Sequence, residues 1–382
     1  MKNIINSKLP NVGTNIFSSM SKLAIENKAI NLSQGYPDFE VDPFLIKLVN
    51  KYMNKGINQY APMQGAIRLR EAISEKIESI YHQYYDINEE ITVTAGATQA
   101  IFTTIAAFIH PKDEVIIFSP AFDCYQPAVE LNGGVPVFIE LEPSEFKIDW
   151  KKVEKKISSK TRMIIINNPH NPLGTIFTEH DMKCLENISQ KYNTLILSDE
   201  VYEHLVYDKN DHISICKYPK LFNNAIATFS FGKTFHITGW KLGYVLAPKH
   251  LMIEIRKVHQ FNVFSCNHPI QLAIADYLQT PDHYLSLNSF YQEKRDLFLE
   301  IVSASRFKAI PCKGTYFQLL NYSNMSVISD TEMAKKLTIS NGIASIPISV
   351  FSFYGKDEQN LRFCFAKKVE TLKRAGDILI KI

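Results

Sequence analysis

The feature of this sequence that most constrains its fold is the regular alternation of short apolar runs with longer amphipathic stretches. Six short runs are rich in β-branched and other apolar residues, which indicates strands: ITVTA (91–95), EVIIFSP (114–120), MIIINNP (163–169), TLILSDE (194–200), AIATFSF (225–231) and GYVLAP (243–248). Strands that are apolar along most of their length are expected where helices cover both faces of a sheet. The alternation therefore predicts an α/β fold, with a mostly parallel sheet sandwiched by helices and functional residues at the carboxyl ends of its strands.

The C-terminal part of the chain has a different pattern. A long helical pattern at 283–304 is followed by short strand-like runs at 315–320 and 360–366. This pattern predicts a smaller α+β unit, which we expect the N-terminal segment to complete in space. The predicted domains are a large one at 47–275 and a smaller discontinuous one made of 1–46 and 276–382.

Composition narrows the class of protein. The 382 residues include 42 Lys and Arg and 39 Asp and Glu, a net charge of +3 at pH 7. Because basic and acidic residues are nearly equal in number, we expect neither nucleic acid nor a membrane as a partner. The six cysteines lack a zinc-binding spacing, so we predict reduced thiols and no metal site. We see no signal peptide and no apolar stretch long enough to cross a bilayer, and expect a cytoplasmic protein.

Lys233 is the first candidate for chemistry. It lies in SFGKTFHITGWKLGY (230–244), just past a predicted strand. A lysine amine can form a Schiff base with a carbonyl when desolvation lowers its pKa, so Lys233 is a candidate anchor for pyridoxal phosphate; the alternative is an ordinary solvated lysine. Ser230 and Lys233 also form an S-x-x-K, and GKT resembles the end of a P-loop. The absence of S-D-N and K-T-G motifs, and Ala227 where a P-loop needs glycine, argue against both.

A pyridoxal phosphate site also needs an anion beside the ring nitrogen and donors to the ring oxygen. Asp199 ends a predicted apolar strand and is the candidate anion; the alternative is that it caps a helix. Asn171 and Tyr202 can both donate hydrogen bonds to the ring oxygen. Asn171 lies in NNPHNPLG, which equally indicates a rigid Asn-Pro turn, and both interpretations can hold together.

Two further groups would bind anions. A predicted helix begins after the first strand, and its free N–H groups and dipole favour a phosphate. Arg362 lies between apolar residues of a predicted strand and is the candidate for a substrate carboxylate. An internal salt bridge is the competing interpretation of Arg362. The candidates for the phosphate are Gly96, Ala97, Thr98, Ser230 and Lys241.

Taken together, the motifs resemble those of the fold-type I, pyridoxal-phosphate-dependent aminotransferases of class I/II. The chain is most similar to the branch of methionine and kynurenine aminotransferases. The resemblance extends over nearly the whole chain and rests on NLSQGYPDF (31–39), QYAPMQGAIRLREAI (59–73), TAGATQAI (94–101), SPAFDCY (119–125), NNPHNPLG (167–174), SDEVYEHLVYD (198–208), SFGKTFHITGWKLGY (230–244), GTYFQLL (314–320) and LRFCFAK (361–367).

The resemblance implies roles for residues beyond those discussed so far. Lys233 would be both the Schiff-base lysine and the proton shuttle. The tyrosine that matches Tyr60 reaches the phosphate of the other subunit in the family, which implies a homodimer with shared sites. Arg362 would bind the substrate α-carboxylate with help from the backbone of Gly35. The remaining matches are Phe122, which would stack on the cofactor ring, Tyr125 close by, and Phe17, Tyr36, Phe264 and Phe351 around the substrate side chain.

The expected function is transamination of an amino acid with an apolar or aromatic side chain, with a 2-oxo acid as acceptor. Ser265 follows Phe264 where some kynurenine-type relatives have histidine, which favours the methionine side of the branch. The alternative with the same cofactor is a cysteine-S-conjugate β-lyase. A non-enzymatic, cofactor-binding regulatory module is a third hypothesis, because fold alone does not determine function.

Overall fold

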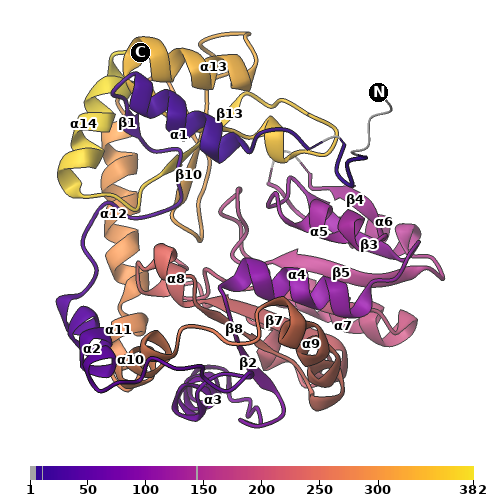
Figure 1. Cartoon of the computed structure of the whole chain (residues 1–382). Helices are drawn as coiled ribbons and strands as arrows, with labels where there is room; N and C mark the ends of the chain where they lie inside the picture. The colour runs from indigo at the N-terminus through magenta and orange to yellow at the C-terminus, as the bar shows by residue number, and fades with distance from the viewer. Residues whose placement is uncertain (1–5, 11, 143–144) are drawn as a thin grey trace, which may run out of the picture.

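A computed structural model describes residues 6–10, 12–142 and 145–382 (Figure 1). Its main feature is a seven-stranded sheet with the order β2-β8-β7-β6-β5-β3-β4. Neighbouring strands from β4 to β7 are parallel, whereas β8 is antiparallel to both β7 and β2. The bounds are β2 Ile91–Thr94, β3 Glu114–Ser119, β4 Val135–Glu140, β5 Thr161–Asn167, β6 Leu195–Asp199, β7 Ala225–Ser230 and β8 Gly243–Leu246.

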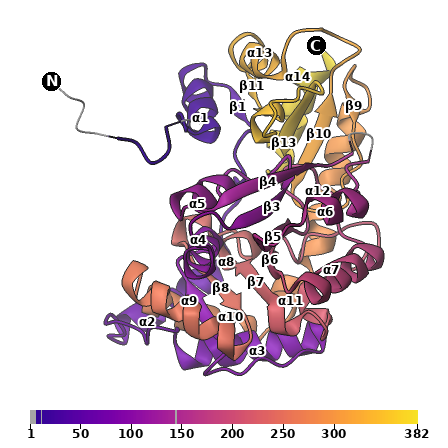
Figure 2. The ribbon, with the colours of Figure 1, turned by 90° about the vertical axis from the view of Figure 1, so that its right-hand side faces the viewer.

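Helices cover both faces of this sheet, as the apolar strands predict (Figure 2). Successive strand residues point to opposite faces. Ile117 and Ile165 accordingly belong to an apolar core shared with α4 (Ala97–Phe108), α5 (Tyr125–Leu131) and α9 (Lys249–Asn262). Ile116 and Ile164 belong to the core on the other face, with α6 (Trp150–Lys156), α7 (Glu179–Tyr192) and α3 (Ile67–Tyr81). The mostly parallel α/β fold is therefore confirmed.

All six predicted strands are present, but β4 was not predicted from the sequence. It pairs with β3 alone, at the edge of the sheet, and most of its residues are partly exposed. Its segment, VPVFIE, also contains Pro136, a residue that fits an edge strand but weakens a strand pattern. The physical reason for the omission is that an edge strand needs fewer apolar residues than the buried strands do.

The rest of the chain forms two small sheets and the helices around them. A four-stranded antiparallel sheet has the order β12-β13-β10-β9, and β1 pairs in parallel with β11. Helices α12 and α14 pack against each other, as do α2 and α10. The bounds are β1 Ile30–Asn31, β9 Lys308–Ala309, β10 Phe317–Asn321, β11 Ile343–Ala344, β12 Ile346–Pro347, β13 Asn360–Cys364, α1 Ile16–Glu26, α2 Pro43–Asn54, α8 Phe231–Thr234, α10 His268–Leu278, α11 Asp282–Leu285, α12 Leu287–Val302, α13 Asp330–Lys336 and α14 Val369–Ile380.

The topology brings the polar strand ends together. Asn167 of β5 pairs with Asp199 of β6, which pairs with Thr228 of β7. Parallel strands end at one edge of the sheet, so the residues that follow them share that edge. Within the described part of the chain, no helix combines the length and the apolar character needed to cross a membrane.

Candidate active site

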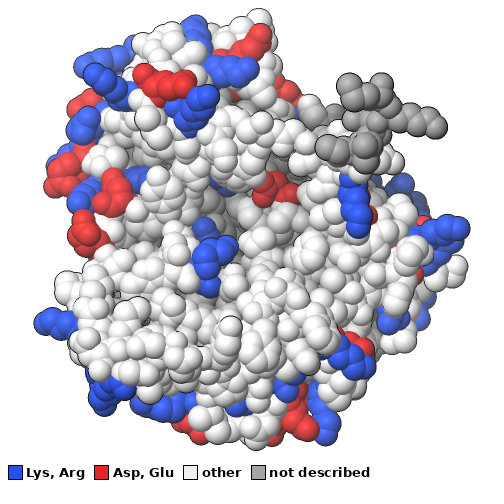
Figure 3. Space-filling model, viewed as in Figure 1, with Lys and Arg blue, Asp and Glu red and all other residues white. Residues whose placement is uncertain are grey.

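A cavity of about 350 Å³ lies at this edge of the large sheet, and we call it the central cavity. Its walls come from the ends of β5, β6 and β7, from the starts of α4 and α8, and from α1 and β13 on the opposite side. Figure 3 shows a hollow in the surface between the edge of the large sheet and the part of the chain that contains α1 and β13. Basic and acidic side chains lie in and beside this hollow. Thirteen of the sequence candidates line it: Phe17, Gly35, Gly96, Ala97, Thr98, Phe122, Asn171, Asp199, Tyr202, Ser230, Lys233, Lys241 and Arg362.

Hydrogen bonds hold both the backbone N–H and the side-chain amine of Lys233. It lies in α8, where its backbone N–H donates to the Ser230 side chain at 3.3 Å. Its Nζ donates to the Gly35 carbonyl at 3.0 Å and to the Tyr316 hydroxyl at 2.9 Å. Burial lowers the pKa of Lys233 to about 8. These contacts exclude the interpretation as a solvated surface lysine, and the amine does not point at Ser230 as an S-x-x-K dyad would require.

Asp199 is a buried carboxylate without an ion-pair partner among the described residues. The Tyr125 hydroxyl donates to its Oδ2 at 2.6 Å, and the Val201 N–H reaches its Oδ1 at 3.3 Å. Burial raises the pKa of Asp199 to about 6, and the hydrogen bond from Tyr125 offsets only part of that rise. A turn rather than a helix follows Asp199, so it does not cap a helix.

Arg362 is a buried cation that also lacks a carboxylate partner among the residues described. Its Nη1 donates to Asn171 Oδ1 at 2.6 Å, its Nη2 reaches the Ser33 carbonyl at 3.3 Å, and its Nε has no partner. The guanidinium lies 3.8 Å above the centre of the Phe317 ring. Burial lowers the pKa of Arg362 to about 10. The alternative of an internal salt bridge is therefore wrong among the described residues, and one buried donor, Nε, is left without a partner.

The opposite end of the cavity is also suited to an anion. Helix α4 begins at Ala97 without a side-chain cap, so its first N–H groups are not capped by a side chain of this chain. Gly96 has a φ of +80°, a conformation that favours glycine, and a Cβ added there would lie 3.5 Å from Lys241 Nζ. Lys241 thus lies over the helix start, and Ser230 lines the same wall. This combination of N–H groups, an ammonium and a hydroxyl suits a phosphate.

The other five candidates lie outside the cavity lining. Tyr125 acts on it through its hydrogen bond to Asp199, and Phe351 packs on Phe17 with ring centres 5.8 Å apart. Tyr36 is exposed, and Lys367 lies over its ring. The rings of Tyr60 and Phe264 contact each other at 5.5 Å, and they are 81% and 44% exposed.

Some residues of the cavity were not singled out from the sequence. Asn167 could have been found, since it ends a predicted strand next to the Asn171 turn; its side chain accepts the Asn171 N–H at 2.6 Å and donates to the Asp199 carbonyl at 2.9 Å. Tyr316 is not part of the lining, but it contacts Lys233 from a distant segment, and no local sequence pattern indicates that contact. The others that line the cavity include Asn15, Gln34, Asp123, Thr238 and Phe317.

Comparisons with known proteins agree with this geometry. The family model described as "Aminotransferase class I and II" matches residues 27–379. Methionine aminotransferase of Escherichia coli K12 is 45% identical over 98% of this chain and 97% of its own length. Human kynurenine–oxoglutarate transaminase 3 is 34% identical over 97% of this chain and 89% of its own. The solved structure of an E. coli methionine aminotransferase superposes with a TM-score of 0.97 at 44% identity, covering 99% of this chain and 100% of that one.

Proposed function

We propose that this chain, which belongs to the class I and II aminotransferase family, transfers the amino group of an apolar or aromatic amino acid to a 2-oxo acid. We further propose pyridoxal 5'-phosphate as its cofactor. The observation that carries the proposal is that one cavity contains Lys233, Asp199 and Arg362, three buried or partly buried charges that have no ion-pair partner within the described chain.

The donor set fits this cofactor. A phosphate suits the uncapped start of α4 beside Lys241, and a protonated ring nitrogen suits the buried carboxylate of Asp199. The Tyr202 hydroxyl and the Asn171 amide are available at the same wall for the ring oxygen. When bound, pyridoxal phosphate supplies an electron-poor ring that can delocalise negative charge from the substrate α-carbon. We propose that the residues that hold it are Gly96, Ala97, Thr98, Phe122, Asn171, Asp199, Tyr202, Ser230, Lys233 and Lys241.

The proposed roles of the chain's own groups follow from their charge states. With a pKa near 8, a fraction of Lys233 is neutral at physiological pH and can accept the substrate α-proton as a general base. Tyr316 and the Gly35 carbonyl position its Nζ. Arg362, which lines the cavity and has an unsatisfied Nε, binds the substrate α-carboxylate through its guanidinium, while Asn171 and the Phe317 ring fix the plane of that group. Asp199 keeps a negative charge buried beside the cofactor nitrogen.

The proposed substrate class rests on the relatives and on the walls near Arg362. Phe17 and Phe351 pack against its guanidinium, at 5.2 and 5.3 Å from the ring centres. These apolar surfaces suit methionine or an aromatic side chain better than a second carboxylate. Tyr36 and Phe264 remain proposed contributors. The relatives named above are transaminases, so a β-lyase and a non-enzymatic regulatory module are not favoured.

We also propose a homodimer in which each subunit completes the site of the other. Tyr60, Phe264 and Phe261 are large aromatic residues with 81%, 44% and 86% of their surface exposed. Exposed aromatic residues are typical of protein interfaces, and two of these three, Tyr60 and Phe264, contact each other. The domains at 47–275 and at 1–46 with 276–382 remain the proposed division of each subunit.

The test is the Lys233→Ala variant. Purified protein is given methionine, phenylalanine or aspartate with a 2-oxo acid acceptor, and the new 2-oxo acid is quantified. We expect turnover with methionine and phenylalanine in the wild type, and a loss of kcat/KM of about a thousandfold or more in the variant, because the general base and the cofactor anchor are both removed. Lys336→Ala, an exposed lysine on α13, is the matched control. Wild-type rates in Lys233→Ala would refute the proposal.

A further inference from the structure

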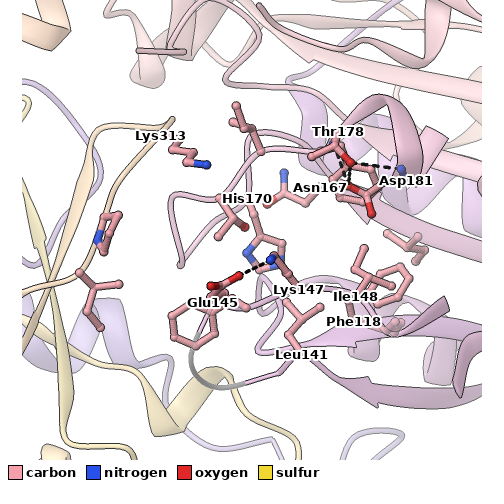
Figure 4. Close-up of a pocket in the computed structure, with 18 of the residues that line it drawn as sticks. Phe118, Leu141, Glu145, Lys147, Ile148, Asn167, His170, Thr178, Asp181 and Lys313 are labelled. Carbon is pink, nitrogen blue, oxygen red and sulfur yellow. Dashed lines mark hydrogen bonds and ion pairs between the residues drawn. The ribbon is translucent and has the colours of Figure 1, made fainter. Parts of the chain in front are cut away.

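A second cavity of about 400 Å³ lies next to the central one, and we call it the rear cavity (Figure 4). It is bounded by Leu141, by segments 145–148, 165–178 and 310–313, and by Ile117, Phe118 and Tyr125. No residue proposed above to bind substrate or cofactor lines it, apart from Tyr125. The rear cavity is therefore a separate space whose occupant the proposed reaction does not define.

The walls of the rear cavity combine an apolar part, which contains three phenylalanine rings, with several polar and charged side chains. Phe118, Phe146 and Phe177 contribute rings, and Leu141 and Ile310 contribute aliphatic surface. Enclosed apolar surface of this extent, with a few polar groups at one side, is typical of sites for small organic molecules. Flat apolar groups pack well between aromatic side chains. The shape and composition of the walls favour an aromatic body.

The charged groups of the rear cavity leave one cation without a partner. The Glu145 carboxylate forms an ion pair with Lys147, and Asp181 accepts hydrogen bonds from the Trp150 indole at 2.8 Å and from the Thr178 side chain. Lys313 is exposed at the cavity and makes no ion pair with a described residue, although the carboxylates of Glu145 and Asp208 lie close enough to feel its charge. Figure 4 shows that Lys313 and His170 both line the rear cavity. One unpaired ammonium, with both acids already engaged, favours an anionic ligand.

His170 provides a second, buried polar group. Only 5% of its surface is exposed, and neither ring nitrogen has a hydrogen-bond partner among the described residues; Nδ1 is fully buried. Burial lowers the pKa of His170 to about 4, so the ring is neutral near pH 7 and carries one donor and one acceptor. A buried ring without partners is costly, and the polar head of a ligand could satisfy Nε2, the ring nitrogen that is not fully buried.

The rear cavity is also connected to the catalytic groups. Tyr125 lines it and donates its hydroxyl hydrogen bond to Asp199. Asn167 lines both cavities, and its side chain contacts Asn171 and the Asp199 carbonyl. An occupant would therefore contact two residues that position Asp199 and Asn171.

We propose that the rear cavity is a binding site for a small monocarboxylate with an aromatic body, with the carboxylate at Lys313 and His170 and the ring between Phe118, Phe146 and Phe177. This inference goes beyond the proposed transamination and does not depend on it. The probe is phenylbutyrate, which has neither an amino nor an oxo group and cannot be transaminated.

The experiment is a fluorescence titration of the holoprotein. The chain has two tryptophans, so a Trp240→Phe background leaves Trp150 as the reporter. Trp150 packs on Phe118, with ring centres 6.0 Å apart, and its indole binds Asp181, so it responds to the rear cavity. We expect a saturable change in Trp150 emission. Lys313→Ala and His170→Phe should each raise the dissociation constant by about tenfold or more, because each removes a polar partner of the carboxylate.

Two controls separate this site from the central cavity. Lys336→Ala should titrate like the parent, because this exposed lysine on α13 lines neither cavity. Arg362→Lys, which alters the carboxylate site of the central cavity, should leave the Trp150 response in place. The proposal would be overturned by a response that Lys313→Ala and His170→Phe leave unchanged, by a response that Arg362→Lys abolishes, or by no response at all.

Discussion

Asp199 and Glu203 belong to the same short segment, and both are almost completely buried, yet their surroundings are opposite. Glu203 accepts hydrogen bonds from the Lys76 ammonium at 2.5 Å and from the Tyr81 hydroxyl at 2.7 Å. Although burial by itself raises the pKa of Glu203, Lys76 and His204 lower it below its ordinary value. Among the described residues, the Asp199 carboxylate contacts only the Tyr125 hydroxyl and, at a longer distance, the Val201 N–H, and its pKa is raised.

The two carboxylates thus differ in their partners. Glu203 is paired with a cation of the chain, whereas Asp199 makes no ion pair with a cation of the described chain. The carboxylate of the neighbouring Glu200 also has its hydrogen-bond partners within the chain. Ser198 and Ile215 bond one oxygen, and His212 bonds the other. A buried ion whose partners lie within the chain contributes to structure, and a partner lost there is costly. A buried ion without a partner in the chain is tolerated where a bound molecule supplies the opposite charge. Such a surrounding is expected of a functional site.

The largest effect is expected from breaking the structural pair. Lys76→Met leaves the Glu203 carboxylate buried without its cation, so the free energy of unfolding should fall by about 3–5 kcal/mol. Urea denaturation of the cofactor-free protein measures this change. The matched control is Lys257→Met, which removes the exposed Lys257–Glu254 pair and should cost at most about 1 kcal/mol. Equal losses in the two variants would show that burial does not distinguish these pairs.

A smaller effect of opposite sign is expected at Asp199. Its pKa is higher in the folded protein than in the unfolded chain, so its ionisation destabilises the fold as pH rises from about 4 to about 6, and the cost is fully present above pH 6. Asp199→Asn keeps an acceptor for Tyr125 but removes the charge. It should therefore stabilise the cofactor-free protein by about 1–3 kcal/mol at pH 8 and by less at pH 5.

Urea denaturation at the two pH values checks this prediction, and transamination by the same variant should be strongly reduced. An Asp199→Asn protein that is less stable than the wild type at pH 8 would place Asp199 with Glu203, among the structural charges.

Residue patterns placed the parts of this site that follow strands, and the family resemblance supplied Phe17 and Gly35 from the N-terminal segment, but the contact made by Tyr316 was not predicted. Asp199 and Lys233 lie at or just after the ends of apolar runs. The apolar pattern of the strands and the positions of these residues were therefore enough to place both at the same edge of the large sheet. The contact of Tyr316 and Gly35 with Lys233 joins distant segments and leaves no local pattern. Arg362 was recognised as a charge in need of a partner, but the choice between a substrate and an internal salt bridge depended on what lies opposite it in space. The Lys76–Glu203 pair was invisible for the same reason.

The most direct test of the central claim locates the cofactor on the chain. The holoprotein is reduced with borohydride, digested, and examined by mass spectrometry for the lysine that carries the pyridoxyl group. We predict the modification on the peptide that contains Lys233, and its loss in Lys233→Ala. A pyridoxyl group on another lysine, such as Lys241, or on none, would contradict the account.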